Sequence, residues 1–286
     1  MTTGVSSKPK NLNMIIAAIN KKAGDRVIGK YGDWGNLDIE RMKTGVGVLD
    51  DALGGGFPVG RVIELYGPSS GGKSLISMLT IAQAQKEGKQ CIYFDVEDSF
   101  SPEFAMMLGV DVDKLYVVNL GIGEHIMDLI CKLLEAHPAL IVVDSIAAMV
   151  PMDILDNSLE KQTMTLKARL MSKALQKITA LNKNSRVTII FINQIIATMA
   201  MYGPKTTTPG GNALKFYSSL RLMVKKGEKL HEDDKKTKPI VGQTVNFQVT
   251  KNKTAPPFKV NAFKFWYADG TIEEPKPKKV GVKKEE

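Results

Sequence analysis

The most constraining feature of this sequence is a glycine-rich octet that matches the phosphate-loop pattern G-x-x-x-x-G-K-[ST]: Gly67, Pro68, Ser69, Ser70, Gly71, Gly72, Lys73 and Ser74. The apolar run 61–66 before it predicts a buried strand, and residues 73–87 after it show helical spacing. In this context the backbone N–H groups of the loop and the helix would cradle phosphate oxygens. We therefore expect a nucleoside triphosphate site in which Lys73 reaches the β- and γ-phosphates and Ser74 binds Mg²⁺.

The composition of the 286-residue chain, with 43% hydrophobic and 24% charged residues, is typical of soluble globular proteins. No apolar stretch is long enough for a transmembrane helix, and the N-terminus lacks an apolar signal core. A cytoplasmic location is expected, where Cys91 and Cys131 would stay reduced. The three histidines lie far apart in the sequence, so no zinc site is predicted: His125, His137 and His231.

The charge balance favours a polyanionic partner. The formal net charge is +9 and the sequence pI is about 9.3, which points to nucleic acid more than to any other partner. Part of the excess lies in residues 275–284, with five lysines and no acid. This segment, within a predicted basic tail over 272–286, is either an arm that attracts phosphate backbones or a solvated disordered end.

Three regions are predicted along the chain. Residues 1–36 hold a short amphipathic helix over 13–23 and a linker; this helix is too short to be stable unless it docks on another surface. Residues 37–271 form an α/β core. Near-continuous apolar strands separated by helices indicate a mostly parallel sheet covered on both faces, with strands expected at 61–66, 90–94, 115–120, 140–143 and 186–193.

Beyond Gly210 the alternation of strands and helices stops. Strands over 219–225, 244–249 and 262–267 follow one another without intervening helices, which predicts antiparallel strands appended at the C-terminal side. The charged segment 225–238 is expected to form a hairpin tip.

Two acidic residues follow predicted strands at the edge where ligands of open α/β sheets bind. Asp144 ends the strand 140–143 and could hold the Mg²⁺ hydration shell, or could instead cap the next helix. Glu97 follows the strand 90–94 and could orient the attacking water and accept its proton. Asp95 and Asp98 stay open as competitors for that role.

Three further polar residues are candidates. Gln194 ends the strand 186–193, where its amide could hydrogen-bond the γ-phosphate and signal its presence to the irregular segment that follows. Lys251 and Lys253 point the same way on an extended chain, so both ammonium groups could face one phosphate cluster. A solvated strand edge, which lysines commonly protect, is the alternative for these two.

With these motifs in hand, the chain resembles the bacterial RecA family of homologous-recombination proteins over residues 13–271. The resemblance depends on six segments: 42–45, 65–69, 141–145, 191–195, 210–217 and 251–253. It implies a RecA-like P-loop ATPase core that uses ATP and Mg²⁺. It also implies a polymerisation role for the N-terminal helix, which would dock on the next subunit.

The resemblance implies a role for each candidate residue. Glu97 would activate the water, and Gln194 would sense the γ-phosphate and head a second DNA loop over about 195–210; the first DNA loop would span about 156–165. Lys251 and Lys253 would reach the ATP of a neighbouring subunit, and Phe216 would lie at the subunit contact. Phe104 and Tyr267 would sandwich the adenine. The residues implied to bind DNA are Met164, Arg169, Lys205, Gly210, Gly211 and Asn212.

The implied function is a DNA-dependent ATPase that forms a filament on single-stranded DNA and exchanges strands with a homologous duplex. Relatives usually continue into a small C-terminal α/β domain, their second loop carries more basic residues than the single Lys205, and an acid stands where this chain has Ser101. The lysine-poor loop keeps open a RecA-like paralogue that binds ATP and loads or regulates a recombinase. A ring helicase is the third interpretation.

Overall fold

A computed structural model describes residues 11–24, 26–34, 39–156, 163–197, 206–234 and 237–275. The chain divides into two compact units, Met1–Ile39 and Glu40–Glu286. The first unit contains helix α1 (Leu12–Ala23), capped by the Asn11 side chain, and a short 3-10 helix, η1 (Tyr31–Trp34). None of the α1 residues is buried, and Leu12 and Met14 are 68% and 72% exposed. The predicted helix is confirmed, and apolar side chains such as Leu12 and Met14 are exposed on it.

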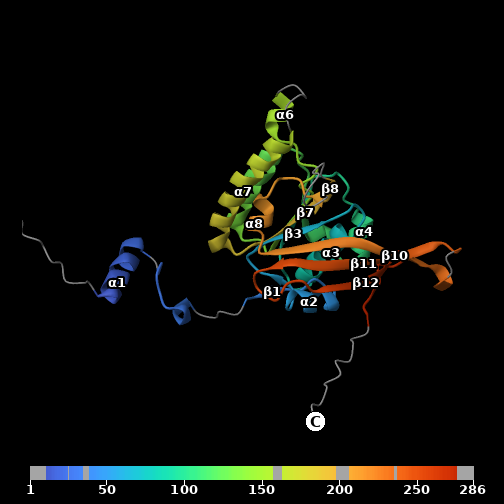
Figure 1. The fold of residues 1–286 in the computed structure, drawn as a ribbon, viewed down its shortest axis with the longest axis horizontal. Helices are drawn as coiled ribbons and strands as arrows, with labels where there is room; N and C mark the ends of the chain where they lie inside the picture. Colours follow the sequence, from blue (N-terminus) through green and yellow to red (C-terminus); the bar gives the residue numbers. More distant parts are fainter. Residues whose placement is uncertain are drawn as a thin grey trace, which may run out of the picture. The chain divides into compact units, whose positions relative to one another are not determined.

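The second unit is built on a nine-stranded sheet (Figure 1). Its strands lie in the order β13 (Ile272–Glu273), β12 (Val260–Trp266), β11 (Ile240–Asn252), β10 (Leu220–His231), β3 (Val62–Gly67), β7 (Thr188–Gln194), β6 (Leu140–Asp144), β4 (Cys91–Asp95) and β5 (Leu115–Val118). All neighbours from β10 to β5 are parallel, and all from β10 to β13 are antiparallel. The predicted α/β class, with antiparallel strands appended at the C-terminal side, is confirmed.

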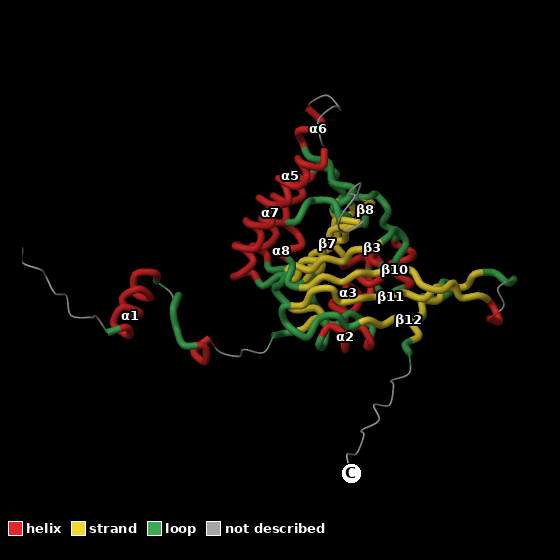
Figure 2. Tube along the Cα trace, in the orientation of Figure 1, coloured by secondary structure: helices red, strands yellow, loops and turns green. Residues whose placement is uncertain are grey.

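Helices cover both faces of this sheet (Figure 2). On one face lie α2 (Gly47–Leu53), α3 (Lys73–Lys86) and α4 (Pro102–Met107), and on the other lie α5 (Gly123–Leu133), α7 (Thr163–Ser185) and α8 (Ala213–Tyr217). Because side chains alternate along a strand, Ile190 joins the first hydrophobic core and Ile189 the second. Burial on both faces explains why the strand sequences are continuously apolar.

Several short elements escape sequence analysis because they span too few residues to show a period. They are β1 (Arg41–Met42) paired with β2 (Phe57–Pro58), β8 (Ile196–Ala197) paired with β9 (Thr206–Thr207), helix α6 (Met152–Asp156), and the 3-10 helices η2 (Val112–Lys114) and η4 (Glu232–Asp234). Helices α2 and α8 were likewise not predicted. A further 3-10 helix, η3 (Leu134–Ala136), directly follows α5.

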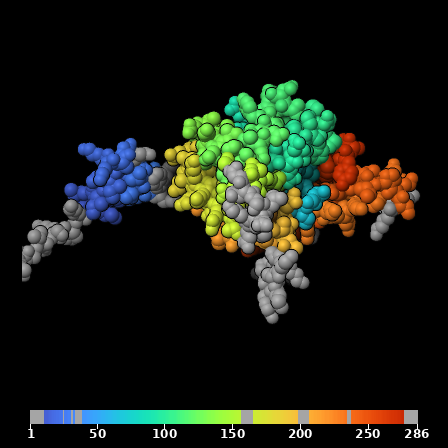
Figure 3. Space-filling model, turned by 90° about the horizontal axis from the view of Figure 1, so that it is seen from above, coloured from blue at the N-terminus to red at the C-terminus, as the bar shows by residue number. Residues whose placement is uncertain are grey.

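The hairpin predicted at the charged segment 225–238 is confirmed, but its tip does not span that whole segment. Strand β10 runs on to His231 and β11 begins at Ile240, so the tip is shorter. The outer part of this β10–β11 ribbon projects from the body of the unit (orange in Figure 3). Its residues pack against no core, so they lack the apolar alternation by which a strand is predicted.

Strand β10 also joins the two halves of the sheet, because it pairs in parallel with β3 and antiparallel with β11.

Within the described residues, no helix is long and apolar enough to cross a membrane.

Candidate active site

The predicted strand, glycine loop and helix are confirmed as β3, residues 67–72 and α3. The loop must approach strand β10 very closely, since a Cβ at Gly67 would lie 1.8 Å from the carbonyl oxygen of Val224. Gly72 precedes α3 with φ of 100°, a left-handed conformation that favours glycine. The two glycines therefore let the loop turn back over the N-terminus of α3, the end of a helix whose first N–H groups have no partner within the helix and attract anions.

Lys73 is buried, and its ammonium lies inside the phosphate loop. Its Nζ donates to the carbonyl oxygens of Gly67, at 3.2 Å, and of Pro68, at 2.7 Å. Burial lowers the pKa of Lys73, while the nearby charges of Asp144 and Glu97 oppose that shift. Since the described residues offer this cation carbonyl oxygens and no ion pair, a phosphate would compensate its desolvation.

Asp144 lies at the centre of the second cluster. Its Oδ2 accepts hydrogen bonds from Ser74 Oγ, at 2.6 Å, and from Tyr93 OH, at 2.8 Å. Asp144 is 4% exposed, and burial raises its pKa. Mg²⁺ prefers oxygen ligands and is usually bound by one or two protein groups together with substrate phosphates and waters. The Asp144 carboxylate and the Ser74 hydroxyl fit that role. Tyr93 was missed because it lies in an apolar strand, where it is expected to be a core residue.

Glu97 is hydrogen-bonded by two side chains. Ser145 Oγ and Gln194 Nε2 both donate to its Oε1, the latter at 2.9 Å. In turn, Gln194 Oε1 accepts from Ser69 Oγ of the phosphate loop at 3.3 Å. The structure thus brings Glu97, Gln194 and the phosphate loop together at the carboxyl ends of β4, β7 and β3.

The two competing acids are engaged elsewhere. Asp95 is 5% exposed, and its two oxygens accept the backbone N–H groups of Ser99 and Phe100, each at 3.0 Å. Asp98 accepts from Asn119 Nδ2 at 3.1 Å. Of the three carboxylates, only Glu97 is bonded to a residue that also contacts the phosphate loop, which favours it as the general base.

A cavity of about 330 Å³ adjoins the loop and is lined by both aromatic residues that the resemblance assigns to adenine, Phe104 and Tyr267. Phe265 packs between them, with ring centroids 6.1 Å from Phe104 and 5.7 Å from Tyr267. Ser101 caps helix α4 through a 3.1 Å bond from Phe104 N and so helps to position that ring. Gln243 and Phe265 also line the cavity and were not foreseen.

A buried network of hydrogen bonds fixes the backbone at Gln194. Asn193 Oδ1 accepts the Gln194 N–H at 3.0 Å, while its Nδ2 donates to Glu64 Oε1 at 3.2 Å and to the Pro209 carbonyl at 3.1 Å. Glu64 is fully buried and pairs with Arg221, whose guanidinium lies 4.4 Å from the centre of the Tyr66 ring. Through Asn193, this network links the end of β7 to Pro209, near the end of the segment that follows β7.

Within the described residues, the two candidate lysines near the end of β11 make no hydrogen bond to the phosphate loop of their own chain. Lys251 Nζ donates to the carbonyls of Lys215, at 2.6 Å, and Phe216, at 3.1 Å. Burial lowers the pKa of Lys251, and the charge of Lys253 lowers it further. Phe216, assigned to a subunit contact, is 71% exposed.

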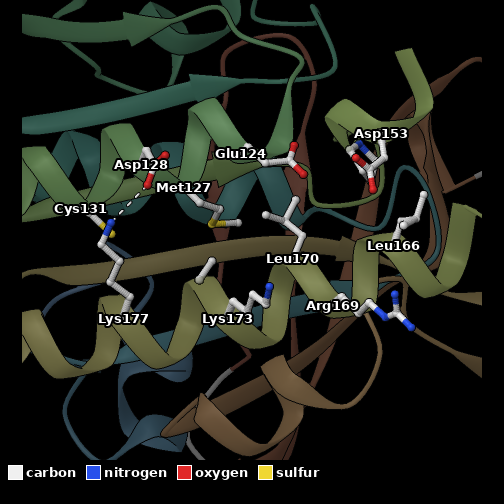
Figure 4. Close-up of a pocket in the computed structure, with 12 residues that line it drawn as sticks. Glu124, Met127, Asp128, Cys131, Asp153, Leu166, Arg169, Leu170, Lys173 and Lys177 are labelled. Atoms are coloured by element: carbon white, nitrogen blue, oxygen red, sulfur yellow. Dashed lines mark hydrogen bonds and ion pairs between the residues drawn. The ribbon is translucent and has the colours of Figure 1, made fainter. Parts of the chain in front are cut away.

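The residues implied to bind DNA divide between two faces of α7. Gly210 and Gly211 line a cavity of about 640 Å³ at the start of that helix. Arg169 instead lines a groove between α5 and α7 (Figure 4). Asn212 accepts from Lys215 Nζ at 3.2 Å. The Met164 side chain, Lys205, residues 157–162 of the first DNA loop, residues 198–205 of the second and the tail beyond residue 275 lie outside the described residues.

Comparison with known proteins agrees with this architecture. The family model of the RecA N-terminal domain matches residues 10–272. The RecA protein of Fusobacterium nucleatum is 42% identical over 271 residues, which cover 94% of this chain and 71% of the relative. Those of Mannheimia haemolytica and Acinetobacter baumannii are also 42% identical and are covered over 71% and 76% of their length.

Among solved structures, the crystal structure of the RadB recombinase shares the fold. It has a TM-score of 0.62 and 22% sequence identity, over 82% of this chain and 100% of the RadB chain. The sequence identity to the curated relatives and the match over nearly the whole chain show that the protein belongs to the RecA family.

Proposed function

We propose that this protein is a DNA-dependent ATPase that forms a filament on single-stranded DNA and catalyses homologous pairing and strand exchange. Its membership of the RecA family supports a role in DNA recombination and repair. One observation carries the finer proposal: the hydrogen-bonded chain from Ser69 through Gln194 to Glu97. This chain links the phosphate loop to the residue directly before the second DNA loop.

Hydrolysis would use the groups in this cluster. Lys73, Ser74 and Asp144 would hold the triphosphate and its Mg²⁺, which supplies charge neutralisation at the phosphoryl group. Glu97 would orient a water and accept its proton as the water oxygen bonds to the γ-phosphorus and ADP leaves. Phe104 and Tyr267 would hold the base.

We propose that Gln194 senses whether the nucleotide carries a γ-phosphate. Its amide currently donates to Glu97 and accepts from Ser69. A γ-phosphate would compete for that amide donor, so Gln194 would bond differently in the ATP and ADP states. Because ATP and ADP would bond differently to Gln194, the nucleotide could shift the conformational equilibrium of the segment that follows Gln194.

Filament formation would complete the site. Lys251 and Lys253 make no bond to their own phosphate loop within the described chain, whereas the exposed Phe216 and the apolar side chains of α1 offer contact surfaces. We propose that α1 and Phe216 join neighbouring subunits, and that the two lysines reach the neighbour's ATP.

The test is ATP hydrolysis with and without single-stranded DNA, imaged in the same samples and followed by a strand-exchange assay. The proposal predicts stimulation by DNA, filaments and joint molecules. Filaments that hydrolyse ATP but never pair DNA would favour the second candidate, a paralogue that loads or regulates a recombinase. The observation in favour of that candidate is the segment 195–210, which carries only one basic residue, Lys205. Closed rings would contradict both.

A further inference from the structure

The turn that follows β11 carries the two lysines that the proposed function needs. Lys251 and Lys253 stand on either side of Asn252, the last residue of β11. The Lys253 N–H donates to the carbonyl of Ser219 at 2.9 Å, while its exposed ammonium makes no hydrogen bond or ion pair within the described residues. The direction in which the Lys253 side chain leaves the surface is therefore set by the backbone of the turn 252–255.

Asn252 closes this turn. Its Oδ1 accepts three hydrogen bonds, from the Thr254 N–H at 2.9 Å, the Thr254 hydroxyl at 2.8 Å and the Ala255 N–H at 3.0 Å. Its Nδ2 donates to the carbonyl of Leu53, at the end of α2, at 3.2 Å. Asparagine stabilises turns by this kind of bonding to nearby backbone groups, so one side chain both folds the turn and ties it to a helix.

Arg41, on strand β1, holds the same turn. Its Nη2 donates to the Thr254 carbonyl at 2.7 Å, and its Nη1 to Thr254 Oγ1 at 3.1 Å. The same Nη1 donates to the carbonyls of Leu53, at 3.2 Å, and Gly56, at 3.4 Å. No carboxylate in the described part of the chain pairs with Arg41. Its guanidinium therefore acts as a planar fork that joins β1, the end of α2 and the turn.

The helix that receives these bonds is rigidly placed. Helix α2 lies against β11 and β12 (Figure 1), and its residues Leu49 and Leu53 are fully buried in the first hydrophobic core. The end of α2 also touches the turn, since a Cβ at Gly54 would lie 2.6 Å from the Cβ of Ala255. The turn is thus bonded to an element that the core holds in place.

We infer that Arg41 is a positioning residue, which with Asn252 fixes the backbone from which Lys251 and Lys253 reach the ATP of a neighbouring subunit. None of the residues that Arg41 bonds lines the described nucleotide cavity of its own chain. Arg41 should therefore affect the neighbour's ATP and leave its own site alone. This inference rests on the proposed function and adds to it a residue that acts through the two lysines.

The first measurement is ATP hydrolysis on single-stranded DNA by Arg41→Met, which removes the fork and keeps an apolar stem. We expect the DNA-stimulated kcat to fall about 10-fold, because a displaced catalytic group loses rate steeply. ATP binding by the isolated chain should match the wild type. Arg186→Met is the matched control, since Arg186 pairs with Glu40, the residue before Arg41, at 3.5 Å and bonds nothing in the turn. It should hydrolyse ATP at the wild-type rate.

A second variant guards against a folding defect in Arg41→Met. Thr254→Val removes the hydroxyl that accepts from Arg41 and donates to Asn252, with little change in side-chain shape. It should lower the DNA-stimulated kcat by a smaller factor and leave ATP binding unchanged. A wild-type kcat in both variants would overturn the inference.

Mixed filaments show on which ATP Arg41 acts. In an equal mixture of Arg41→Met with Glu97→Gln, about a quarter of the interfaces would join an intact base to an intact lysine turn, so hydrolysis should return to about that fraction of the wild-type rate. In a mixture with Lys251→Ala, every lysine turn is defective. That mixture should give only the average of the two separate rates.

The opposite pattern would overturn the inference. Recovery with Lys251→Ala but not with Glu97→Gln would mean that Arg41 serves its own nucleotide site, and recovery with neither would mean that it serves folding. Complementation between Glu97→Gln and Lys251→Ala is the reference for both mixtures. If those two variants share filaments and restore no hydrolysis, the shared site of the proposed function fails, and the inference fails with it.

Discussion

The nucleotide end of the sheet and the cavity at the start of α7 use polar groups in opposite ways. At the nucleotide end, Ser69, Gln194, Glu97 and Ser145 are bonded to one another within the chain. In the cavity, Lys167 has only a carbonyl and Thr208 has no partner among the described residues. The side chains of the first site therefore hold one another in place, whereas those of the second have few partners in the described chain. We therefore expect substitutions at the nucleotide end to have the largest effects on hydrolysis.

The largest effect is expected for Lys73→Ala. Removing the cation from the loop should lower ATP hydrolysis about 10³-fold, because no other described group donates into the loop from that position. Thermal unfolding should change little, since the lysine is buried without an ion pair. Lys86→Ala, at the exposed end of α3, is the control; equal losses in both variants would contradict the assignment.

Glu97→Gln should slow turnover about 10²-fold while filaments on DNA still form. The amide keeps the size of the side chain but cannot accept the proton of the attacking water. Steady-state hydrolysis and imaging of the same sample check this. Asp98→Asn should turn over normally; if it stalled and Glu97→Gln did not, Asp98 would be the base.

Asn193→Ala tests the support of Gln194. The variant removes the acceptor of the Gln194 N–H and a donor to buried Glu64. We expect stimulation of hydrolysis by DNA to fall about 5-fold, with DNA-independent hydrolysis unchanged. Equal loss of both activities would show that Asn193 serves stability alone. Asn246→Ala, on the β10–β11 ribbon, is the control.

Asp144→Asn should separate stability from function. Because burial raises the pKa of Asp144, its ionised form is disfavoured in the folded state. Its contribution to stability is therefore present below the unfolded pKa and is lost as pH rises through the folded pKa. At neutral pH the variant should have a higher free energy of unfolding than the wild type, and the gain should vanish in acid. Hydrolysis should be lost, and a variant less stable than wild type at pH 7 would refute this account.

The sequence was sufficient for every residue whose position follows from a strand end. Gly67 to Ser74, Glu97, Asp144 and Gln194 each lie at or just after the carboxyl end of a parallel strand, and such ends share one edge of the sheet. The apolar runs that fixed those strands are long and buried on both faces. The roles of these residues stay predictions.

What the sequence could not show are partners far apart in the chain. Glu64 and Tyr93 lie inside apolar strands, and their partners Arg221 and Asp144 are joined to them only by the fold. Thr208 lies in an irregular segment, and its lack of a partner is visible only when its surroundings are known. The outer part of the β10–β11 ribbon could not be predicted as strand because its residues pack against no core and therefore show no alternation of apolar and polar residues.

The central claim is that the active site is completed by a neighbouring subunit, and mixing two inactive variants tests it most directly. Glu97→Gln lacks the base and Lys251→Ala lacks the lysine, so each alone should hydrolyse little ATP on single-stranded DNA. In an equal mixture, about a quarter of the interfaces would pair an intact Glu97 with an intact Lys251. We predict that DNA-dependent hydrolysis returns to about that fraction of the wild-type rate. No recovery in filaments shown to contain both variants would contradict the account.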